Sequence, residues 1–442
     1  MRNIQGRPLV RGVVLAASVS LLLSACGGGS DDGGGGGAAA GDTTGVTGES
    51  IKIGTHMPLT GVAAPGYSEI SPGAKAYFDY VNAAGGVNGR QIEYIVKDDG
   101  YNPTRTGEVV NELVLQDQVF GLIQGLGTPT HSSVIDSLNS DEVPDLFVSS
   151  GALAWDQPEK YPFSFGWQPD YEVEGKILGE YIKANFPNAK VGLFLQGDDL
   201  GADGSKGLKR FIEDQIVVEQ TYTSGTRDVS TQIAALKNAG ADLVVGFNTP
   251  TYTALSQLAS LGQGYKPQWF YTNVGLDPQL VGGLLSNLSQ GKVSGNQALE
   301  GLFTTKYLAT SDQADDPWVK LWQKVWQAHG SGKPLTNYNI YGMAGAYTFV
   351  QALQSAGEDV SRQSIVEAIE ENGSSWESPA LAPFDYSADS HRGITGVQVV
   401  QIKGGGISAL TPTKVTDEGD APIEDAAGDD DAPDEDGIPN EG

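Results

Sequence analysis

The chain has 442 residues and a hydrophobic content of 39%, enough to build ordinary packed cores in two or three domains. Its formal net charge is −28, which argues against nucleic acids and anionic membrane surfaces as partners because both are polyanions. A single cysteine excludes a disulfide framework, a thiolate metal cage and a cysteine-based enzyme.

The N-terminal residues 1–25 are typical of a secretory signal peptide. Three arginines precede an apolar run over 12–23 that is too short to span a membrane, and the run ends at a small-residue site. The sequence Leu-Ser-Ala-Cys at 23–26 resembles the bacterial lipoprotein cleavage box. The resemblance predicts that Cys26 is lipidated and becomes the first residue of an extracytoplasmic protein held at a membrane by its lipid anchor.

Two further segments are predicted to lie outside the folded part. Residues 26–49 are rich in glycine and nearly free of large apolar side chains, so we expect a flexible linker. Residues 413–442 form an acidic tail that we expect to be disordered, because 417–442 hold twelve acidic residues and no Lys or Arg. The stretch 434–440 resembles one incomplete aspartate-rich calcium repeat, and a solvated tail is the competing interpretation.

Short β-rich runs alternate with helix-period segments from Glu49 onward, which predicts βαβ units and parallel sheets flanked by helices. In the first series we expect strands at 51–55, 91–97, 119–124 and 145–149, and helices at 70–84, 104–116 and after Thr130.

A second series follows Pro169. It predicts helices at 171–185, 203–214, 229–239 and 251–261, and strands at 190–195, 216–222, 241–246 and 267–271. Two doubly wound α/β sheets fit this number of strands better than one open sheet. Later helices around 316–329 and 339–356 must pack back on one sheet, so the chain crosses between the lobes more than once.

Ligands of open α/β sheets bind outside the carboxyl ends of the strands, where loops meet helix N-termini. The loops predicted to lie there are 57–66, 125–130, 149–154, 196–201, 247–251 and 271–275.

Several of these loops carry a recognisable pattern. It comprises Ile51-Lys52-Ile53-Gly54, Met57-Pro58-Leu59-Thr60-Gly61, Gly73-Ala74, the run Asn82 to Gly89, Asp98-Asp99, Ser149-Ser150-Gly151-Ala152, Pro162 to Trp167, Gly197 to Gly201, Gly207-Leu208-Lys209 and Ala239 to Asp242. Over residues 50–405 the chain resembles the branched-chain amino acid type of periplasmic binding proteins.

The resemblance implies the type I periplasmic binding protein fold, in which two similar α/β lobes joined by three crossovers clasp a ligand. We expect lobe 1 to comprise 50–167 and 301–372, and lobe 2 to comprise 168–300 and 373–412. It also implies a monomer that delivers a small molecule to an ABC permease and ATPase complex. Closure of two such lobes is favourable only when a matching solute bridges them.

In lobe 1, the resemblance places the ligand carboxylate at the 125–130 loop, with Gly127, Thr128 and Thr130 as ligand-binding residues. A glycine-opened loop that feeds a helix N-terminus offers free N–H donors and the positive end of a helix dipole. A structural turn is the competing interpretation, and a dinucleotide fingerprint fails because Thr130 replaces its third glycine. The next loop adds Ser150, Gly151 and Ala152.

In lobe 2, the expected ligand-binding residues are Leu200, Asn248, Thr249 and Asn273. The 271–275 loop lacks the acidic residue that pairs with an α-ammonium group in amino acid binders. An ammonium buried without a carboxylate would cost several kcal/mol. Unless Glu69 or Asp199 moves in, the pattern therefore favours a hydrophobic aromatic or aliphatic carboxylate, with a branched-chain amino acid as the alternative.

Aromatic side chains near these loops are candidate walls of the site, although the same residues could be ordinary core aromatics. They are Tyr101, Trp155, Trp167 and Phe247, of which we expect Tyr101 to bind ligand.

An enzyme is not predicted. The four histidines show no metal-ligand spacing, and the Gly-x-Ser-x-Gly elbow of α/β hydrolases does not occur. His56 and His131 fall in cleft loops, where each could touch ligand or simply be solvent-facing or locally bonded. We expect no catalytic residue, metal or cofactor, and the remaining alternatives are a surface sensor without an importer and an α/β hydrolase.

Overall fold

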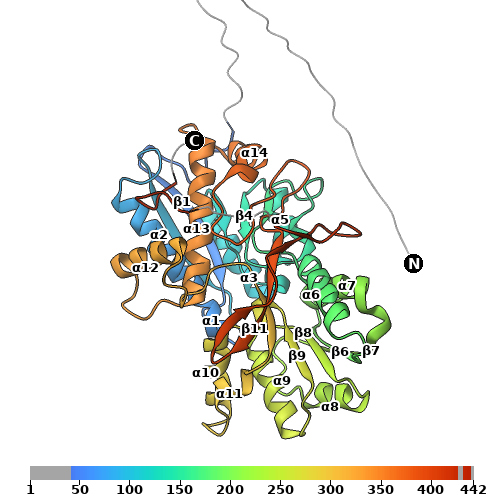
Figure 1. The fold of residues 1–442 in the computed structure, drawn as a ribbon. Coiled ribbons are helices and arrows are strands. Elements are labelled where there is room, and N and C mark those ends of the chain that lie inside the picture. The colour runs from blue at the N-terminus through green and yellow to red at the C-terminus, as the bar shows by residue number, and fades with distance from the viewer. Residues whose placement is uncertain (1–40, 427–431, 440–442) are drawn as a thin grey trace, which may run out of the picture. The chain divides into compact units, whose positions relative to one another are not determined.

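The computed structural model describes residues 41–426 and 432–439 (Figure 1). The predicted signal peptide, Cys26 and linker residues 26–40 lie outside this range. Within the described residues, no helix is long and apolar enough to cross a membrane.

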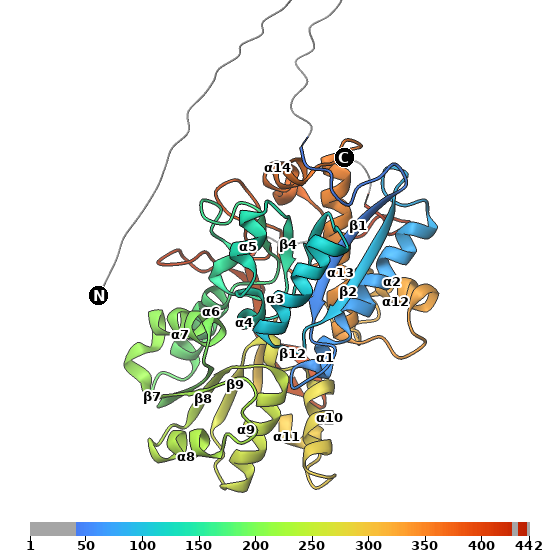
Figure 2. The ribbon, with the colours of Figure 1, turned by 180° about the vertical axis from the view of Figure 1, so that it is seen from behind.

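The first sheet is parallel throughout and, in the described part of the chain, has the order β2-β1-β3-β4-β5. Its strands are β1 Ser50–Met57, β2 Gln91–Asp98, β3 Gly121–Ile123, β4 Asp145–Val148 and β5 Ser164–Gly166. Helix α13 lies in front of this sheet in Figure 1, and α3 lies in front of it in the reverse view of Figure 2. Helices on both faces explain why β3, β4 and β5 are buried and read as apolar runs.

The helices of this lobe begin where the sequence supplies caps. Asn102 caps α3 by accepting hydrogen bonds from the N–H groups of Thr104 and Arg105, with Pro103 in the first turn. The helices are α1 Ala64–Tyr67, α2 Ile70–Ala83, α3 Pro103–Asn111 with a π-helical extension Glu112–Gln116, α4 Thr128–His131, α5 Ile135–Ser140, the 3₁₀ turn Leu153–Trp155, α12 Pro317–His329, α13 Asn337–Ala356 and α14 Arg362–Asn372.

The second sheet starts parallel and continues antiparallel. Its parallel part runs β7-β6-β8-β9-β10, with β6 Val191–Gln196, β7 Ile216–Tyr222, β8 Leu243–Phe247, β9 Gln268–Tyr271 and β10 Phe303–Lys306. Its antiparallel part holds β11 Gly396–Lys403, β12 Gly406–Ala409, β13 Lys414–Val415 and β14 Glu424–Asp425. Its helices are α6 Tyr171–Asn185, α7 Asp199–Ile212, α8 Ser230–Asn238, α9 Pro250–Gly262, α10 Pro278–Leu288 and α11 Gly295–Leu299, with 3₁₀ turns at Glu213–Gln215, Asn273–Gly275 and Gly373–Ser375.

The chain passes between the two sheets three times. It leaves β5 for α6 through 167–170, leaves β10 for α12 through 307–316, and leaves α14 for β11 through the segment that ends at 395. The predicted fold class, with two α/β lobes and three crossovers, is therefore confirmed.

The predicted lobe boundaries at 301 and 373 differ from the sheets. β10 pairs with β9 and β11, so residues 303–306 belong to the second sheet although they were predicted in lobe 1. Residues 384–394 were predicted in lobe 2, yet Tyr386 packs against Phe147 and Phe165 and donates a hydrogen bond to the carbonyl of Gly166. In both cases the chain crosses between the lobes after the segment, whereas the prediction placed the crossover before it.

The end of the predicted linker is folded. Residues 41–49 pack on lobe 1, where the N–H of Lys52 donates to the carbonyl of Gly45 and the N–H of Arg362 donates to the carbonyl of Asp42. The guanidinium of Arg362 also pairs with the Asp42 carboxylate at 2.9 Å. The expectation of a flexible linker up to residue 49 was wrong for its last nine residues, since these polar contacts hold them.

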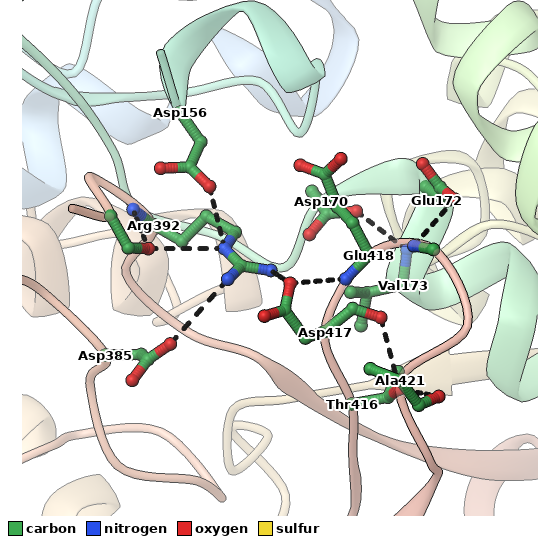
Figure 3. Close-up of polar contacts among 12 residues, drawn as sticks. Asp156, Asp170, Glu172, Val173, Asp385, Arg392, Thr416, Asp417, Glu418 and Ala421 are labelled. Atoms are coloured by element: carbon green, nitrogen blue, oxygen red, sulfur yellow. Dashed lines mark hydrogen bonds and ion pairs between the residues drawn. The ribbon is translucent and has the colours of Figure 1, made fainter. Parts of the chain in front are cut away.

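The described part of the acidic tail is also folded, against our expectation. Residues 413–426 add β13 and β14 to the second sheet and contact a cationic patch, defined as Lys176, Arg210 and Arg392. The Nζ of Lys176 donates to the carbonyls of Asp417 and Ala421, whereas Arg210 pairs with Asp420 and Arg392 with Asp417, as Figure 3 shows for Arg392. The Arg392 guanidinium contacts Asp417 at 2.5 Å and Asp156 at 2.9 Å. The high acidic content led us to expect disorder. This expectation failed because the sequence does not reveal which cationic side chains the fold places opposite the tail.

Residues 432–439 contact α2, α12 and α13. Tyr77 donates a hydrogen bond to the carbonyl of Gly437 at 3.0 Å, and the Nζ of Lys324 donates to the carbonyl of Asp436 at 3.2 Å. The calcium interpretation is not supported here, because the 436 and 437 carbonyls accept from the protein itself. In the described residues, no group of three or more His, Cys, Asp or Glu side chains could hold a metal ion.

Candidate ligand-binding site

A cavity of about 140 Å³ lies where the carboxyl ends of both sheets meet the crossovers. Apolar cavities of about 150 Å³ hold molecules of the size of benzene, so this one has room for a small organic molecule. It is lined by Tyr67, Ile70, Tyr101, Leu126, Gly127, Thr128, Ser149, Gln168, Tyr171, Leu200, Thr249, Asn273, Val274, Leu276, Asp277, Pro278, Thr305, Lys306, Tyr307, Leu308, Ala309, Thr310, Asn337, Tyr338, Tyr341 and Ile407.

Six of the predicted ligand-binding residues line this cavity: Tyr101, Gly127, Thr128, Leu200, Thr249 and Asn273. They come from both lobes and from four of the six predicted loops or their neighbours. The rule that ligands bind beyond the carboxyl ends of parallel strands thus points to the edge of each sheet where this cavity lies.

The other five predicted residues lie behind the wall. The hydroxyl of Thr130 donates to the carbonyls of Leu126 at 2.6 Å and Gly127 at 3.0 Å, so it closes the loop instead of facing the cavity. The amide of Asn248 donates to Thr253 and to the Thr249 carbonyl. Ser150, Gly151 and Ala152 likewise do not line the cavity.

Ser150 and Gly151 support the residues that do. The Ser150 hydroxyl is 2.8 Å from the Thr128 hydroxyl and accepts a hydrogen bond from the N–H of Ala152. A Cβ on Gly151 would lie 2.6 Å from the carbonyl oxygen of Pro169, so a glycine lets this loop pack on the first crossover.

The dipole argument for the 125–130 loop needs correction. Helix α4 is a single turn of four residues, and its second residue is Pro129, which has no N–H. So short a helix sums few peptide dipoles, and its free donors reduce to the N–H groups of Thr128 and Thr130. Recognition at this end depends on individual hydrogen bonds rather than on a helix field.

A buried donor without a partner lies in the cavity wall. The Oε1 of Gln168 accepts a hydrogen bond from the Tyr341 hydroxyl at 3.1 Å, whereas its Nε2 is buried with no partner. Buried polar groups are normally paired, so this atom indicates where a ligand supplies an acceptor.

Six tyrosines line the cavity within the described residues: Tyr67, Tyr101, Tyr171, Tyr307, Tyr338 and Tyr341. Burial raises the pKa of each hydroxyl, so all six stay protonated at neutral pH. The Tyr67 hydroxyl donates across the cleft to the carbonyl of Val274 at 3.0 Å. The rings supply apolar contact area, and the hydroxyls supply further donors.

The charged side chains that line the cavity, within the described residues, are Asp277 and Lys306. Asp277 lies just beyond the 271–275 loop, which itself holds no acidic residue. Its two oxygens accept hydrogen bonds from the N–H of Leu280 and from the Nδ2 of Asn337, each at 2.7 Å. The Nζ of Lys306 donates to Gln313 at 3.1 Å, and burial lowers its pKa.

A second carboxylate lies behind the 271–275 loop. Glu174 accepts hydrogen bonds from the Thr272 hydroxyl at 2.5 Å, from the N–H of Asn273 at 2.7 Å and from the Thr305 hydroxyl. Burial raises its pKa, and it does not line the cavity. Of the two acids that could have moved in, Glu69 accepts from the Thr336 hydroxyl at 2.6 Å, and Asp199 is exposed.

Three of the four candidate aromatic walls belong to the core. Trp155 packs edge-on against His131, Trp167 donates to the Thr348 hydroxyl, and Phe247 is fully buried. Only Tyr101 lines the cavity. Hydrophobicity alone cannot separate the two roles, since both kinds of residue are buried.

The residues that the sequence did not reveal come mostly from the crossovers. Gln168 and Tyr171 belong to the first crossover and the start of α6, residues 305 and 306 end β10, and residues 307–310 belong to the second crossover. Tyr338 and Tyr341 lie on the first turns of α13. A usable signal existed in the tyrosines at 338 and 341, whose spacing of three places them on one helix face.

The chain matches the family model described as periplasmic binding protein over residues 50–406. It is 25% identical over 330 residues to the "Leu/Ile/Val-binding protein homolog 1" of Brucella suis biovar 1 (strain 1330), covering 73% of this chain and 83% of that protein.

Solved structures of similar fold include a "fatty acid ABC transporter substrate-binding protein" from Thermomonospora curvata, with a TM-score of 0.73 and 24% identity over 84% of this chain and 94% of that one. Another is a "branched chain amino acid ABC transporter" protein from Thermus thermophilus with bound valine, with a TM-score of 0.70 and 20% identity over 83% of this chain and 96% of that one. Members of this group bind solutes and are not enzymes, and the family is extracytoplasmic. The chain belongs to the periplasmic binding protein family.

Proposed function

We propose that this protein is the lipid-anchored binding component of an ABC importer and that its ligand is a small hydrophobic carboxylate, aromatic or aliphatic. The observation that carries the ligand class is the unpaired, buried Nε2 of Gln168 in the cavity wall. It can donate to a ligand acceptor, and a carboxylate offers about four acceptor sites.

The apolar part of such a ligand meets the tyrosine rings. Burying about 150 to 200 Å² at roughly 25 cal/mol per Å² stabilises the complex by about 4 to 5 kcal/mol. Hydrogen bonds to a charged carboxylate add roughly 1.5 to 3 kcal/mol each. These gains offset the cost of association and make a micromolar Kd attainable.

Lys306 contributes a positive charge to the wall, which favours an anion. Each oxygen of Asp277 accepts one hydrogen bond from the protein, from Leu280 or Asn337, so an α-ammonium group bound there would have to share the carboxylate with these two donors. The fatty acid described for the Thermomonospora curvata structure is a ligand of the proposed class.

The alternative ligand is a branched-chain amino acid, and Asp277 is the observation that favours it. Its carboxylate lines the cavity, and the relatives include Leu/Ile/Val-binding protein homologues. In this case the ligand ammonium would donate to the lone pairs of Asp277 that Leu280 and Asn337 do not use.

A ligand panel decides between the two. Thermal unfolding of the full mature chain is measured with hexanoate, benzoate, leucine and valine, and calorimetry gives the Kd of each compound that raises Tm. We expect hexanoate or benzoate to raise Tm and leucine to leave it unchanged. Stabilisation by leucine and valine with no effect of either simple acid would contradict the proposed class.

The anchor and the importer are tested separately. Replacing Cys26 with serine should release the protein from the membrane fraction in cells, because the thioether attachment point is lost. Genes for a permease and an ATPase next to this gene would support import. Their absence would favour the alternative, a surface sensor that acts without an importer. We propose that the protein acts as a monomer in either role.

A further inference from the structure

Four buried ionisable side chains form a continuous hydrogen-bonded row beneath the lobe 1 binding loops. The Nδ1 of His56 is 2.8 Å from Asp99, its Nε2 is 2.9 Å from the Nδ1 of His131, and the Nε2 of His131 is 2.7 Å from Asp145. All four residues are fully buried. We call Asp99, His56, His131 and Asp145 the quartet.

The quartet's geometry sets its proton count. Three hydrogen bonds join the four groups, and each needs one hydrogen. Two ionised carboxylates and two neutral imidazoles carry only two hydrogens, which face Asp99 and Asp145. The facing nitrogens of His56 and His131 would then oppose lone pairs at 2.9 Å. The observed contact therefore requires a third proton, which leaves the quartet with one net negative charge.

The quartet touches the elements that line the cavity. The N–H of Tyr101 donates to Asp99 at 2.8 Å, which holds this residue at a positive φ of 58°. The carbonyl of His56 accepts from the N–H of Leu126, and the N–H of His131 donates to the carbonyl of Gly127. A movement of either imidazole would therefore be transmitted to the cavity wall.

Gly125 fixes the loop directly on the two imidazoles. A Cβ at this position would lie 2.7 Å from both the Nδ1 of His131 and the Nε2 of His56. The loop thus passes over the bond that needs the third proton. Any widening of the imidazole pair acts first on residues 125–128, which include Leu126, Gly127 and Thr128 of the wall.

Few other titratable groups face the quartet. The groups whose charges act on His56 are His131, Asp99 and Asp145. The neighbouring elements present neutral groups, namely the Thr106 hydroxyl from α3, the Ser164 hydroxyl from β5 and the Trp155 ring. His391 bonds the carbonyl of Ser164 and the carboxylate of Glu370, not the quartet.

We propose that His56 and His131 are positioning residues, and that the third proton shared by the quartet holds the 125–128 loop in its ligand-binding geometry. Losing that proton places two lone pairs in opposition, spreads the imidazoles and moves the loop. Ligand affinity therefore falls as pH rises. Burial lowers the pKa of His56, which favours loss of the proton, and the hydrogen bond to Asp99 opposes this effect.

The variant Asp145→Asn separates this role from simple packing. An amide nitrogen in place of Oδ2 would donate to the Nε2 of His131, which then donates to His56, which donates to Asp99. All three hydrogen bonds form with both imidazoles neutral. The same amide can also donate to the Ser164 hydroxyl, which lies 2.9 Å from Asp145. Asp99→Asn also allows all three hydrogen bonds with both imidazoles neutral, because its amide can donate to His56. It replaces Asp145→Asn in the experiment if that variant fails to fold.

The experiment is nuclear magnetic resonance of the full mature chain between about pH 5 and 8, following histidine ring nitrogens and the amides of residues 125–128. We expect the wild type to lose one proton from the imidazole pair, with the loop amides shifting at the same pH. Asp145→Asn should show neither transition. The control Asp136→Asn, an acid on exposed α5 that binds Tyr161, should behave like the wild type.

Two results would overturn the proposal: imidazoles that do not titrate together in the wild type, or loop amides that stay fixed while they do. The link to affinity rests on the proposed function and is measured with hexanoate. Its Kd should rise with pH in the wild type, by at most about tenfold per pH unit for one proton, and stay constant in Asp145→Asn. Failure of hexanoate to bind at any pH would contradict the ligand class, whereas the resonance data judge the quartet independently.

Discussion

Asp170 caps helix α6 through a hydrogen bond from the N–H of Val173 at 2.7 Å, while its second oxygen is buried without a partner (Figure 3). Burial raises the pKa of this carboxyl to about 7, and Arg392 only partly opposes the effect. Near neutral pH the first crossover therefore carries a carboxyl that gains from staying protonated.

The exchange Asp170→Asn should stabilise the protein, and more so at higher pH. Because the folded pKa lies above the unfolded value of 3.8, the native state holds the extra proton between about pH 4 and 7, and stability falls with pH across that window. Above it the ionised Asp170 costs a few kcal/mol, since raising a pKa by one pH unit corresponds to about 1.4 kcal/mol. Asparagine keeps the cap and removes the cost.

Chemical denaturation at pH 5 and pH 8 measures this difference. The stabilisation by Asp170→Asn should be clearly larger at pH 8. Asp316→Asn, the same exchange at the half-buried cap of α12, serves as the control and should show a smaller dependence on pH. Equal stabilisation at both pH values would show that Asp170 is not protonated in the folded protein.

A larger residue in place of Gly437 would force either the Leu321 side chain or the C-terminal segment to shift. Its φ is +80°, and a Cβ there would lie 2.2 Å from the Cδ1 of Leu321. We expect Gly437→Ala to lower the free energy of unfolding by about 2 kcal/mol, through left-handed strain and overpacking. Gly301→Ala is the matched control, because Gly301 has the same φ of +80° and nothing within 4 Å.

The difference between Gly437→Ala and Gly301→Ala measures the contribution of the contact between Gly437 and Leu321. Thermal unfolding should show a larger loss of Tm for Gly437→Ala than for Gly301→Ala, and limited proteolysis should cut the C-terminal residues of the former faster. Equal losses would mean that only backbone strain matters and that residues 432–439 contribute little to lobe 1.

The exchange Gln168→Glu tests the ligand class at one atom. The Oε1 that accepts from Tyr341 is retained, while the unpaired Nε2 becomes a second carboxylate oxygen. A charge-assisted hydrogen bond is then replaced by repulsion, so we expect the Kd for hexanoate to rise by about 100-fold or more. The neutral amide hexanamide, with its own donors, should lose much less. If both probes weaken equally, Gln168 does not contact the acidic group.

The fold could be predicted from the sequence because the residue pattern of each strand and helix is local. Apolar runs such as 191–196 and amphipathic segments such as 203–212 reveal strands and helices through their periodicity, and alternation of the two predicts parallel sheets. The structure of the C-terminal residues could not be predicted in this way. β13 and the docked residues 432–439 depend on Arg392, Tyr77 and Leu321, which lie far away in the sequence.

The binding site could be predicted only where its residues come soon after the carboxyl ends of the strands. Thr128 and Leu200 lie in the first turns of the helices that follow β3 and β6, and they line the cavity. Gln168 and Tyr307 lie on crossovers, and whether a crossover faces a cavity depends on how the two lobes pack. The quartet was missed for a similar reason, since its four residues come from separate segments, and His131 links His56 to Asp145 only in the folded lobe.

Thr128 and Thr130 look like equivalent hydroxyls in the sequence, but the structure gives them different contacts. The Thr128 hydroxyl lines the cavity and lies 2.8 Å from Ser150, whereas the Thr130 hydroxyl donates to two carbonyls of its own loop. Removing a hydrogen bond to a charged ligand costs roughly 1.5 to 3 kcal/mol, so Thr128→Val should raise the Kd for hexanoate by about ten- to 100-fold and change Tm little.

Thr130→Val should show the reverse pattern. It leaves the carbonyls of Leu126 and Gly127 without the Thr130 hydroxyl, and we expect a loss of about 1 kcal/mol in the free energy of unfolding with a smaller effect on Kd. Calorimetry and denaturation on both variants give the four values needed. A larger rise in Kd for Thr130→Val than for Thr128→Val would mean that the ligand binds behind the loop, and the assignment of the cavity wall would then have to be reversed.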